Sequence, residues 1–463
     1  MTPPKRTPTA AAKLSAGAES STGPTRAPRW SQRQAEAHLR SLELFGMRFG
    51  LDRMRRMMTV LGSPQQDYDC IHVLGTNGKT STTRMIAAIL QRHGLRTAAY
   101  TSPHLISYRE RLQIDEREVS DEELAQAIAQ AAWAAERVNR TLEGEDHVTQ
   151  FELLTAAALW QIAEREVQVA VIEAGLGGRY DATSVIDASV TVLTNVGLEH
   201  TRWLGPTVHD IAEEKLAVVG REATLVLGVD LHPEARAVAE RVAGERGARI
   251  LTAGGEQAAP RESGAPPLAA RGAFQQRNFA LARIAAEAYL ERAGVVRQEQ
   301  AVREAGQLTE VRGRLQTVAE DPLTVLDGAH NPDAVRALVQ TLPQLLGERP
   351  LGLVLGVLED KDAVGMLQPL LGLCERAWFT APPSERALSP GALQSLARQL
   401  GFEAVSSEPN PERALAEAQR WARERGGAVL ATGSVYLVGA LLEALQRAPA
   451  AEELAASRRR SAR

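Results

Sequence analysis

The heptapeptide GTNGKTS, residues 75–81, constrains the fold of this chain more than any other stretch of its 463 residues. The short, apolar run CIHVL stands before it and predicts a buried strand over Cys70–Leu74. The pattern after it predicts a helix over Ser81–His93. A glycine turn between a strand and a helix leaves backbone N–H groups free at the helix N-terminus, where the helix dipole also attracts anions. The heptapeptide therefore predicts a phosphate-binding loop.

This loop is shorter than the common spelling G-x-x-x-x-G-K-[ST], which has four residues between its glycines. Gly75 and Gly78 enclose only two. Lys79 still follows the second glycine, where its charge can reach β- and γ-phosphate oxygens, and the hydroxyl of Thr80 or Ser81 can approach Mg²⁺. A simple glycine turn would not require Gly-Lys-Thr at this place. We therefore expect a nucleotide to bind to a shorter kind of loop.

Strands alternate with helices along the rest of the chain. Two further apolar runs, Val167–Ala174 and Ala188–Val196, predict parallel strands, and helical patterns over Asp121–Val138 and Phe151–Glu166 accompany them. A second set of elements begins near Gln316 and has four predicted strands: Leu323–Ala329, Leu351–Leu358, Arg376–Ala381 and Gly427–Gly433. This alternation is typical of doubly wound α/β sheets.

The predicted fold class is α/β, with two domains. We expect an N-terminal P-loop NTPase-like doubly wound domain over residues 31–311 and a smaller C-terminal Rossmann-like α/β domain over residues 312–447. Residues 1–30, rich in Pro, Ala, Ser and Thr, are expected to form a disordered extension, and residues 448–463 a charged tail.

Composition excludes several classes of partner. A formal net charge of −4 gives no electrostatic footprint for nucleic acid. No apolar run reaches the length that spans a membrane, and the two cysteines, Cys70 and Cys374, form no metal-type cluster. We expect a cytoplasmic monomer that binds small molecules, with no nucleic acid and no membrane among its partners.

The spelling G-T-N-G-K-T-S resembles the phosphate loop of the Mur ligase superfamily, which consists of ATP-dependent amide ligases. Four later stretches resemble its folate branch, the dihydrofolate synthases and folylpolyglutamate synthases. These stretches are TSPHL (residues 101–105), EAGLGGRYDAT (173–183), EHTRWLGPT (199–207) and DGAHNPDAV (327–335). The matches run from about Phe45 to Leu445, in the order of the family. The departures are mild; Thr80 replaces the usual Gly and Glu199 the usual Asp.

The resemblance implies ATP and two magnesium sites. Glu173 also stands at a predicted strand end, where α/β sheets bind ligands and a carboxylate can hold Mg²⁺. By resemblance, the metal ligands are Ser102, Glu173 and His200. The ATP-binding residues implied in the same way are Thr76, Asn77, Gly78, Lys79, Thr80, Asn278, Arg314 and Asp327.

Three residues match catalytic positions of the family: Lys79, Lys215 and His330. Lys215 corresponds to the lysine that is carbamylated in this superfamily, a change that turns a cation into an anion. An alternative is a lysine on a helix surface that pairs with Glu213 or Glu214. His330 matches a residue at the acceptor side of the site.

Patches resembling the family's dihydropteroate contacts predict a pocket for a pteridine. Phe151 could offer an aromatic face to a flat heterocycle, or it could be a core residue of the helix that follows it. The substrate-binding residues implied by resemblance are Phe49, Gly50, Thr149, Gln150, Phe151, Glu152, Tyr180, Asp181 and Ala182.

The implied reaction adds L-glutamate to dihydropteroate, forming dihydrofolate, and to reduced folates, forming γ-linked polyglutamates, through an acyl phosphate. Three alternatives stay open. One is a monofunctional folylpolyglutamate synthase, and another is a peptidoglycan-precursor ligase, which is not expected to carry DGAHNP or TSPHL. The third is a non-catalytic nucleotide-binding module, which would tolerate loss of the catalytic side chains, although the chain retains them.

Overall fold

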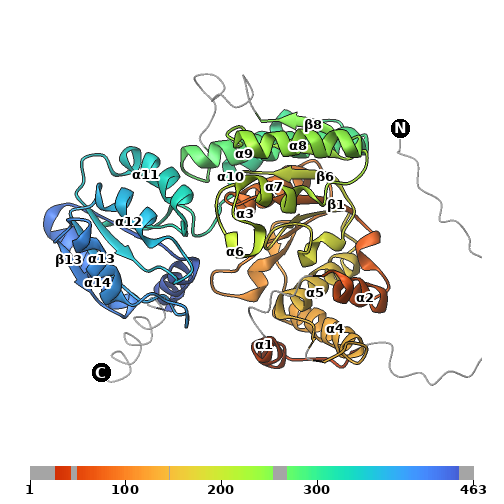
Figure 1. The fold of residues 1–463 in the computed structure, drawn as a ribbon, viewed down its shortest axis with the longest axis horizontal. Helices are drawn as coiled ribbons and strands as arrows, with labels where there is room; N and C mark the ends of the chain where they lie inside the picture. The colour runs from red at the N-terminus through yellow and green to blue at the C-terminus, as the bar shows by residue number, and fades with distance from the viewer. Residues whose placement is uncertain (1–26, 43–49, 145, 254–267, 448–463) are drawn as a thin grey trace, which may run out of the picture.

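A computed structural model describes residues 27–42, 50–144, 146–253 and 268–447 of the chain (Figure 1). The predicted extension, apart from residues 27–30, and the predicted tail at 448–463 lie outside this part, as does Phe49. Two β-sheets organise the described residues. The strands of the first fall between Asp69 and Thr252 and those of the second between Gln316 and Thr432.

The first sheet has eight strands in the order β4-β3-β2-β5-β1-β6-β7-β8. The strands from β2 to β8 along this order run parallel, whereas β3 pairs antiparallel with both β2 and β4. The bounds are β1 Asp69–Leu74, β2 Thr97–Tyr100, β3 Leu112–Ile114, β4 Arg117–Glu118, β5 Val169–Glu173, β6 Ala188–Leu193, β7 Thr224–Leu227 and β8 Arg249–Thr252.

Helices cover both faces of this sheet because its central strands are apolar on both sides. Ile71 and Val73 pack on one face, and Cys70 packs on the other, as the alternation of side chains along a strand requires. The first face carries α3 Lys79–Arg92, α9 Ala273–Ala293 and α10 Glu299–Leu308. The opposite face carries α2 Asp52–Val60, α4 Asp121–Asn139, α5 Gln150–Glu164, α7 Val208–Leu216 and α8 Pro233–Arg246.

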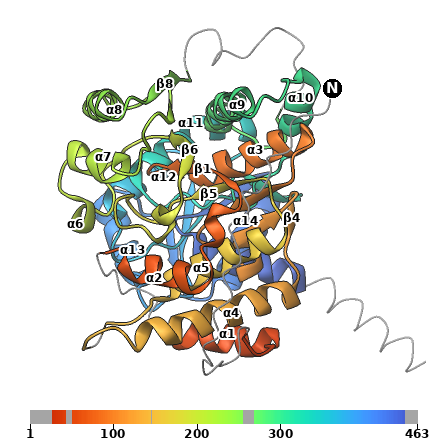
Figure 2. The same cartoon turned by 90° about the vertical axis from the view of Figure 1, so that its right-hand side faces the viewer.

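Short elements complete this domain, and Figure 2 shows its layers from the side. Helix α1 packs on α4 as an outer layer. The bounds are α1 Gln32–Ser41, α6 Thr201–Leu204, and the 3-10 turns η1 Pro64–Gln66, η2 Tyr108–Arg111 and η3 Ala182–Val185. None of the described helices combines the length and the apolar content that crossing a membrane requires.

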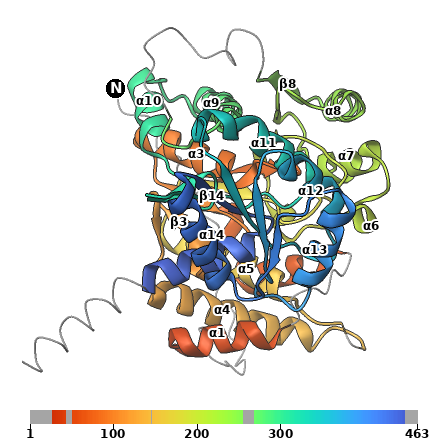
Figure 3. The same cartoon turned by 90° about the vertical axis from the view of Figure 1, so that its left-hand side faces the viewer.

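The second sheet has six strands in the order β13-β12-β11-β14-β10-β9, and only β9 is antiparallel to its neighbour. Its bounds are β9 Gln316–Glu320, β10 Leu323–Leu326, β11 Leu351–Leu355, β12 Arg376–Phe379, β13 Val405–Ser407 and β14 Ala428–Thr432. One face carries α11 Pro332–Leu346, α12 Ala363–Leu371 and α13 Pro390–Gln399. The other face carries α14 Pro411–Arg425 and a last helical segment over residues 435–447 (Figure 3).

The structure confirms each predicted strand and helix named above, with ends that differ by a few residues. The predicted strand Leu323–Ala329 is three residues too long, because β10 ends at Leu326 and the chain turns at Asp327. The pattern missed the strands β2, β3, β4, β7, β8, β9 and β13. These have two to five residues each, too few to show a period.

Candidate active site

A cavity of about 320 Å³ lies at the carboxyl ends of the central strands, and residues of both domains line it. The first domain contributes the phosphate loop, Ser102, Glu173, His200, Lys215 and Asn278. The second contributes Asp327 and His330, and Arg314 lines the cavity from the segment that joins the domains. Open parallel sheets bind ligands at this edge. Most of the predicted ATP, metal and catalytic residues thus meet in one place.

The phosphate loop follows β1 and opens α3, as predicted, and its glycines are required by close neighbours. A Cβ on Gly75 would lie 1.8 Å from Thr194 Oγ1, and one on Gly78 would lie 2.6 Å from Asn278 Oδ1. Gly78 also has a φ of 82°, in the left-handed region that favours glycine. The predicted residue Asn278 therefore lies directly against the loop.

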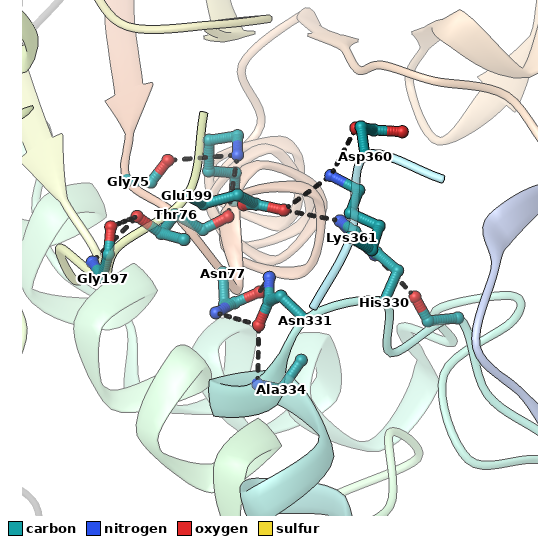
Figure 4. A network of polar contacts seen from close by, with 12 residues as sticks. Gly75, Thr76, Asn77, Gly197, Glu199, His330, Asn331, Ala334, Asp360 and Lys361 are labelled. Carbon is teal, nitrogen blue, oxygen red and sulfur yellow. Dashed lines mark hydrogen bonds and ion pairs between the residues drawn. The ribbon is translucent and has the colours of Figure 1, made fainter. Parts of the chain in front are cut away.

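The segment that follows β6 holds the phosphate loop in place by hydrogen bonds. The sequence did not predict these bonds. Asn195 accepts the N–H of Thr76 at its carbonyl (3.0 Å) and the N–H of Asn77 at its side-chain oxygen (2.9 Å). Thr194 Oγ1 donates to the carbonyl of Asn77 at 2.6 Å. The N–H of Gly197 donates to Thr76 Oγ1 at 3.0 Å (Figure 4). The dipeptide Thr-Asn at the end of a predicted strand was the available signal.

Two lysines meet at the start of the loop. Lys79 Nζ donates to the carbonyls of Gly75 and Thr76, each at 3.1 Å. Lys215 Nζ donates to the same Gly75 carbonyl at 3.0 Å, and its side chain is buried. Burial, and then the charge of Lys79, lower the pKa of Lys215 to about 7. Lys215 is therefore a buried group of the cavity rather than a lysine on a helix surface.

Oxygen atoms suited to Mg²⁺ gather around Glu173, which is 1% exposed at the end of β5. Thr80 Oγ1 donates to both carboxylate oxygens at 2.9 Å, and the N–H of Ser102 donates to Oε2 at 3.1 Å. Burial raises the pKa of Glu173, an effect that the charge of Lys79 opposes. A buried carboxylate beside two hydroxyl-bearing residues, open to a phosphate site, fits a hard cation.

His200 lines the same cavity. Burial lowers its pKa to about 4, so its imidazole is neutral near pH 7 and can act as a ligand. Within the described ranges, no three His, Cys, Asp or Glu side chains surround one metal position. A magnesium ion here would therefore complete its shell with hydroxyls, phosphate oxygens and water.

Glu199 links the two domains. Its Oε1 lies 3.0 Å from Lys361 Nζ and 3.4 Å from His330 Nε2, and both partners come from the second domain (Figure 4). Burial alone would raise the pKa of Glu199, but His330 and Lys361 hold it well below its ordinary range. The sequence placed His330 at the site and missed Lys361, because their common partner lies more than 130 residues earlier in the chain.

Arg314 and Asp327 shape the junction between the domains. A Cβ on Gly328 would lie 2.2 Å from Arg314 Nη1, so this glycine leaves room for the guanidinium. Asp327 is buried and accepts the N–H groups of Leu315 (2.9 Å) and Ala329 (2.8 Å). Burial raises its pKa, against the charge of Arg314. Asp327 thus fastens the turn after β10 to the junction, and its contact with ATP stays a prediction.

Phe151 and Asp181 pack against Gly175, and we call these three residues the aromatic wall. The nearest atom to a Cβ on Gly175 would be Phe151 Cζ at 2.4 Å, and Asp181 Oδ2 lies 3.1 Å away. Gly175 also lines the cavity. Asp181 is buried and accepts the N–H groups of Leu176 and Thr183. Ala182 is buried behind this wall, and Tyr180 is 46% exposed. The predicted pteridine side thus adjoins the phosphate side.

Other side chains that were predicted to contact substrate are hydrogen-bonded to other residues of the protein. Thr149 and Glu152 form a capping box at the start of α5, and Glu152 also accepts Arg53 Nε at 3.0 Å. Gln150 Nε2 donates to the carbonyl of Leu39 at 2.7 Å. These three residues and Gly50 do not line the cavity, and neither do Phe151, Tyr180, Asp181 and Ala182, whose contacts with substrate stay a prediction. The spacing T-x-x-E was a readable capping signal, and a buried ion pair with Arg53 was not predicted.

Fold and site together define a two-domain α/β protein that binds a nucleotide between its domains. Residues 73–263 match the Mur ligase middle domain, and residues 313–435 match the Mur ligase glutamate ligase domain. The folylpolyglutamate synthase of Lacticaseibacillus casei is 33% identical over 416 residues, which cover 84% of this chain and 94% of that protein. The dihydrofolate synthase/folylpolyglutamate synthase of Bacillus subtilis is 30% identical over 421 residues, 87% and 96% of the two chains.

A solved structure of a relative has the same fold. Escherichia coli FolC in complex with DHPP and ADP superposes with a TM-score of 0.78 at 28% identity, covering 91% of this chain and 99% of that one. The chain therefore belongs to the dihydrofolate synthase/folylpolyglutamate synthase family of Mur ligases, and it is an ATP-dependent ligase. The predicted family and the predicted pair of α/β domains are confirmed.

Proposed function

We propose that this ligase uses ATP and Mg²⁺ to join L-glutamate to dihydropteroate and to reduced folates through an acyl phosphate. One observation carries the proposal: Lys79 and Glu173 of the first domain and His330 of the second line one cavity, and Phe151 packs against Gly175, which also lines it. A phosphate loop, an oxygen-rich cation position and an aromatic wall therefore adjoin, which is what phosphorylation of a pteridine-linked carboxylate requires.

The reaction needs an activated carboxylate, because oxide is a very poor leaving group. A carboxylate oxygen of the acceptor attacks the γ-phosphorus of ATP, the bond from that phosphorus to the bridging oxygen breaks, and ADP leaves. The amine of glutamate then attacks the acyl carbon and loses a proton, and phosphate leaves. Lys79 and Arg314 would stabilise the negative charge that shifts during both steps. Bound Mg²⁺, held by Glu173, Thr80, Ser102 and His200, would add Lewis-acid neutralisation of phosphate charge.

Carbamylation of Lys215 is part of the proposal. The ammonium group of Lys215 first loses one proton, and the neutral amine attacks carbon dioxide. A new N–C bond forms, one C–O π bond breaks and a second proton leaves the nitrogen, so the original cation becomes an anion. The pKa of about 7 supports this step, since about half of the Lys215 amines are neutral at pH 7. The resulting carbamate would face Lys79 and could help to hold a second cation.

Bifunctionality is favoured by the wall of Phe151 and Asp181 and by the name of the Bacillus subtilis relative. The Lacticaseibacillus casei relative carries the name of the folylpolyglutamate activity alone, so a monofunctional enzyme is the second candidate. The test is ADP release by the purified protein with ATP, Mg²⁺ and glutamate plus either dihydropteroate or tetrahydrofolate. We expect both acceptors to stimulate release. Stimulation by tetrahydrofolate alone would make the enzyme monofunctional, and stimulation by neither would overturn the proposal.

Domain limits, assembly and location complete the proposal. The chain would divide at residues 311/312 and act as a cytoplasmic monomer. Cys70 and Cys374 are both free and buried, which supports a reducing compartment. Light scattering coupled to size exclusion tests the monomer, for which we expect the chain mass of 50.0 kDa.

A further inference from the structure

Two asparagine side chains form a reciprocal pair across the domain interface. Asn77 Nδ2 donates to Asn331 Oδ1 at 3.2 Å, and Asn331 Nδ2 donates to Asn77 Oδ1 at 2.9 Å (Figure 4). Asn77 belongs to the phosphate loop, and Asn331 precedes α11 in the second domain. Asn331 is 4% exposed, so the pair is largely shielded from competing water.

Each asparagine is also held within its own domain. The backbone of Asn77 is bound on both sides, by Asn195 and by Thr194. Asn331 Oδ1 accepts the N–H of Ala334 at 2.9 Å as the N-cap of α11. The backbone of Asn77 and the side chain of Asn331 are therefore each held by bonds within their own domain. The amide pair adds a contact that exists only when the second domain is seated on the phosphate loop.

The neighbours of the pair along the chain carry the chemistry. Lys79 follows two residues after Asn77, and His330 immediately precedes Asn331. A rigid connection between the two asparagines therefore fixes where the phosphate loop lies relative to His330 and its partner Glu199. Other contacts between the domains, such as Lys361 with Glu199, use long flexible side chains that define position less closely.

We propose that Asn331 is a positioning residue, which holds the second domain in register with the phosphate loop through Asn77. The reaction it serves is the ligation proposed above, and the inference rests on that function. Loss of the pair should slow the steps that need both domains. It should leave nucleotide binding to the loop nearly unchanged, because Thr194 and Asn195 still hold the loop.

The test is Asn331→Ser, because serine remains a good N-cap but is too short to reach Asn77. The matched control is Asn410→Ser. Asn410 is also an N-cap followed by proline, at the start of α14, and its side chain accepts the N–H of Arg413 at 3.0 Å in an exposed position. Asn77→Ser removes the same pair from the other side. We expect kcat to fall about tenfold in Asn331→Ser, with the Kd for ADP within about twofold of wild type and the melting temperature equal to that of Asn410→Ser.

A second readout is independent of activity. Cysteines introduced at the exposed positions Glu240 in α8 and Glu424 in α14 accept a dye pair, while the native cysteines are buried. Asn331→Ser should broaden the distribution of energy transfer between these dyes, and Asn410→Ser should not.

The kcat of the double variant, Asn77→Ser with Asn331→Ser, should be no lower than that of the less active single variant, since both changes remove one shared contact. Equal kcat and equal energy transfer in Asn331→Ser and Asn410→Ser would overturn the positioning role, as would additive losses in the double variant. If Asn331→Ser does not fold, Asn77→Ser decides by the energy transfer alone, because Asn77 is also a predicted ATP-binding residue. Wild-type protein that releases no ADP with either acceptor would instead overturn the proposed function, whatever the energy transfer shows.

Discussion

Lys79 and Lys215 donate to the same carbonyl oxygen, that of Gly75, at 3.1 and 3.0 Å. Two ammonium groups that share one neutral acceptor repel each other, and the charge of Lys79 is one cause of the lowered pKa of Lys215. The pair therefore favours any change that brings in negative charge, whether a nucleotide phosphate beside Lys79 or a carbamate on Lys215.

Replacing the first of these lysines should stop catalysis without unfolding the protein. We expect Lys79→Ala to lower ATP turnover at least a hundredfold, since its charge would no longer stabilise the transferring phosphoryl group. The same change should raise the pKa of Lys215, because one repelling charge is gone. Steady-state ADP release measures the first effect, and circular dichroism checks the fold. Turnover near the wild-type rate in a folded variant would contradict the assignment of the loop.

Carbamylation should follow the titration of Lys215. Only the neutral amine reacts with carbon dioxide, so labelling should be slight below about pH 6 and rise through the pKa of about 7. The measurement is the carbamate signal in carbon-13 NMR after addition of labelled bicarbonate, from pH 6 to pH 8. Lys215→Ala should lack the signal and lose activity, and a short added carboxylate should restore part of that activity. An unlabelled wild type together with an active alanine variant would rule the modification out.

The buried charge of Lys215 should also appear in stability. Its pKa is about 7 in the folded protein against an ordinary 10.5, so the unfolded chain binds the proton more tightly. The cost of burying the charge is fully present below pH 7 and is relieved as pH rises from 7 to 10.5. In buffer free of carbon dioxide, Lys215→Met should therefore be more stable than wild type at pH 6, by at most about 5 kcal/mol. Denaturant unfolding should show this advantage shrinking toward pH 10, and an advantage that grows with pH would contradict it.

The aromatic wall should distinguish the two acceptors. Phe151→Ala removes the ring that packs on Gly175, and we expect a loss of roughly ten- to hundredfold in kcat/KM for dihydropteroate, corresponding to about 1–3 kcal/mol. The loss for tetrahydrofolate should differ, because the pteridine must lie differently for its more distant carboxylate to react. Phe402→Ala, a partly buried ring in the second domain, controls for general damage. Equal losses with both acceptors would assign Phe151 to the core.

A glycine in the second domain should prove essential to docking. A Cβ on Gly439 would lie 2.1 Å from the carbonyl oxygen of Leu105, in the loop that also carries Ser102. We expect Gly439→Ala to force the loop and the last helical segment apart, at a cost of about 1–3 kcal/mol in unfolding free energy and with reduced turnover. Gly391→Ala is the matched control, because no atom lies within 4 Å of its added Cβ. A Gly439 variant as stable and active as the control would contradict this contact.

Features that a short stretch of chain encodes could be predicted from the residues alone. The strand–glycine loop–helix unit around Lys79, the alternation of strands with helices, and the second set of elements after Gln316 are patterns that extend over ten to twenty residues. Their physical causes, the period of apolar side chains and the backbone freedom of glycine, act locally. Resemblance to a family added Lys215 and His330, which no local pattern assigns.

Which side chains meet across the domains, and which are already hydrogen-bonded within the protein, could not be predicted in this way. Thr149 and Glu152, predicted as substrate contacts, cap α5, and Glu152 also accepts a hydrogen bond from Arg53. Asp327 fastens the domain junction. Asn77 with Asn331 and Glu199 with Lys361 are pairs separated by 254 and 162 residues. Such pairs depend on how the two sheets and their helices pack against each other. No periodicity records that packing, because a side chain gives the same local pattern whether its partner is a substrate, a solvent molecule or a residue of the other domain.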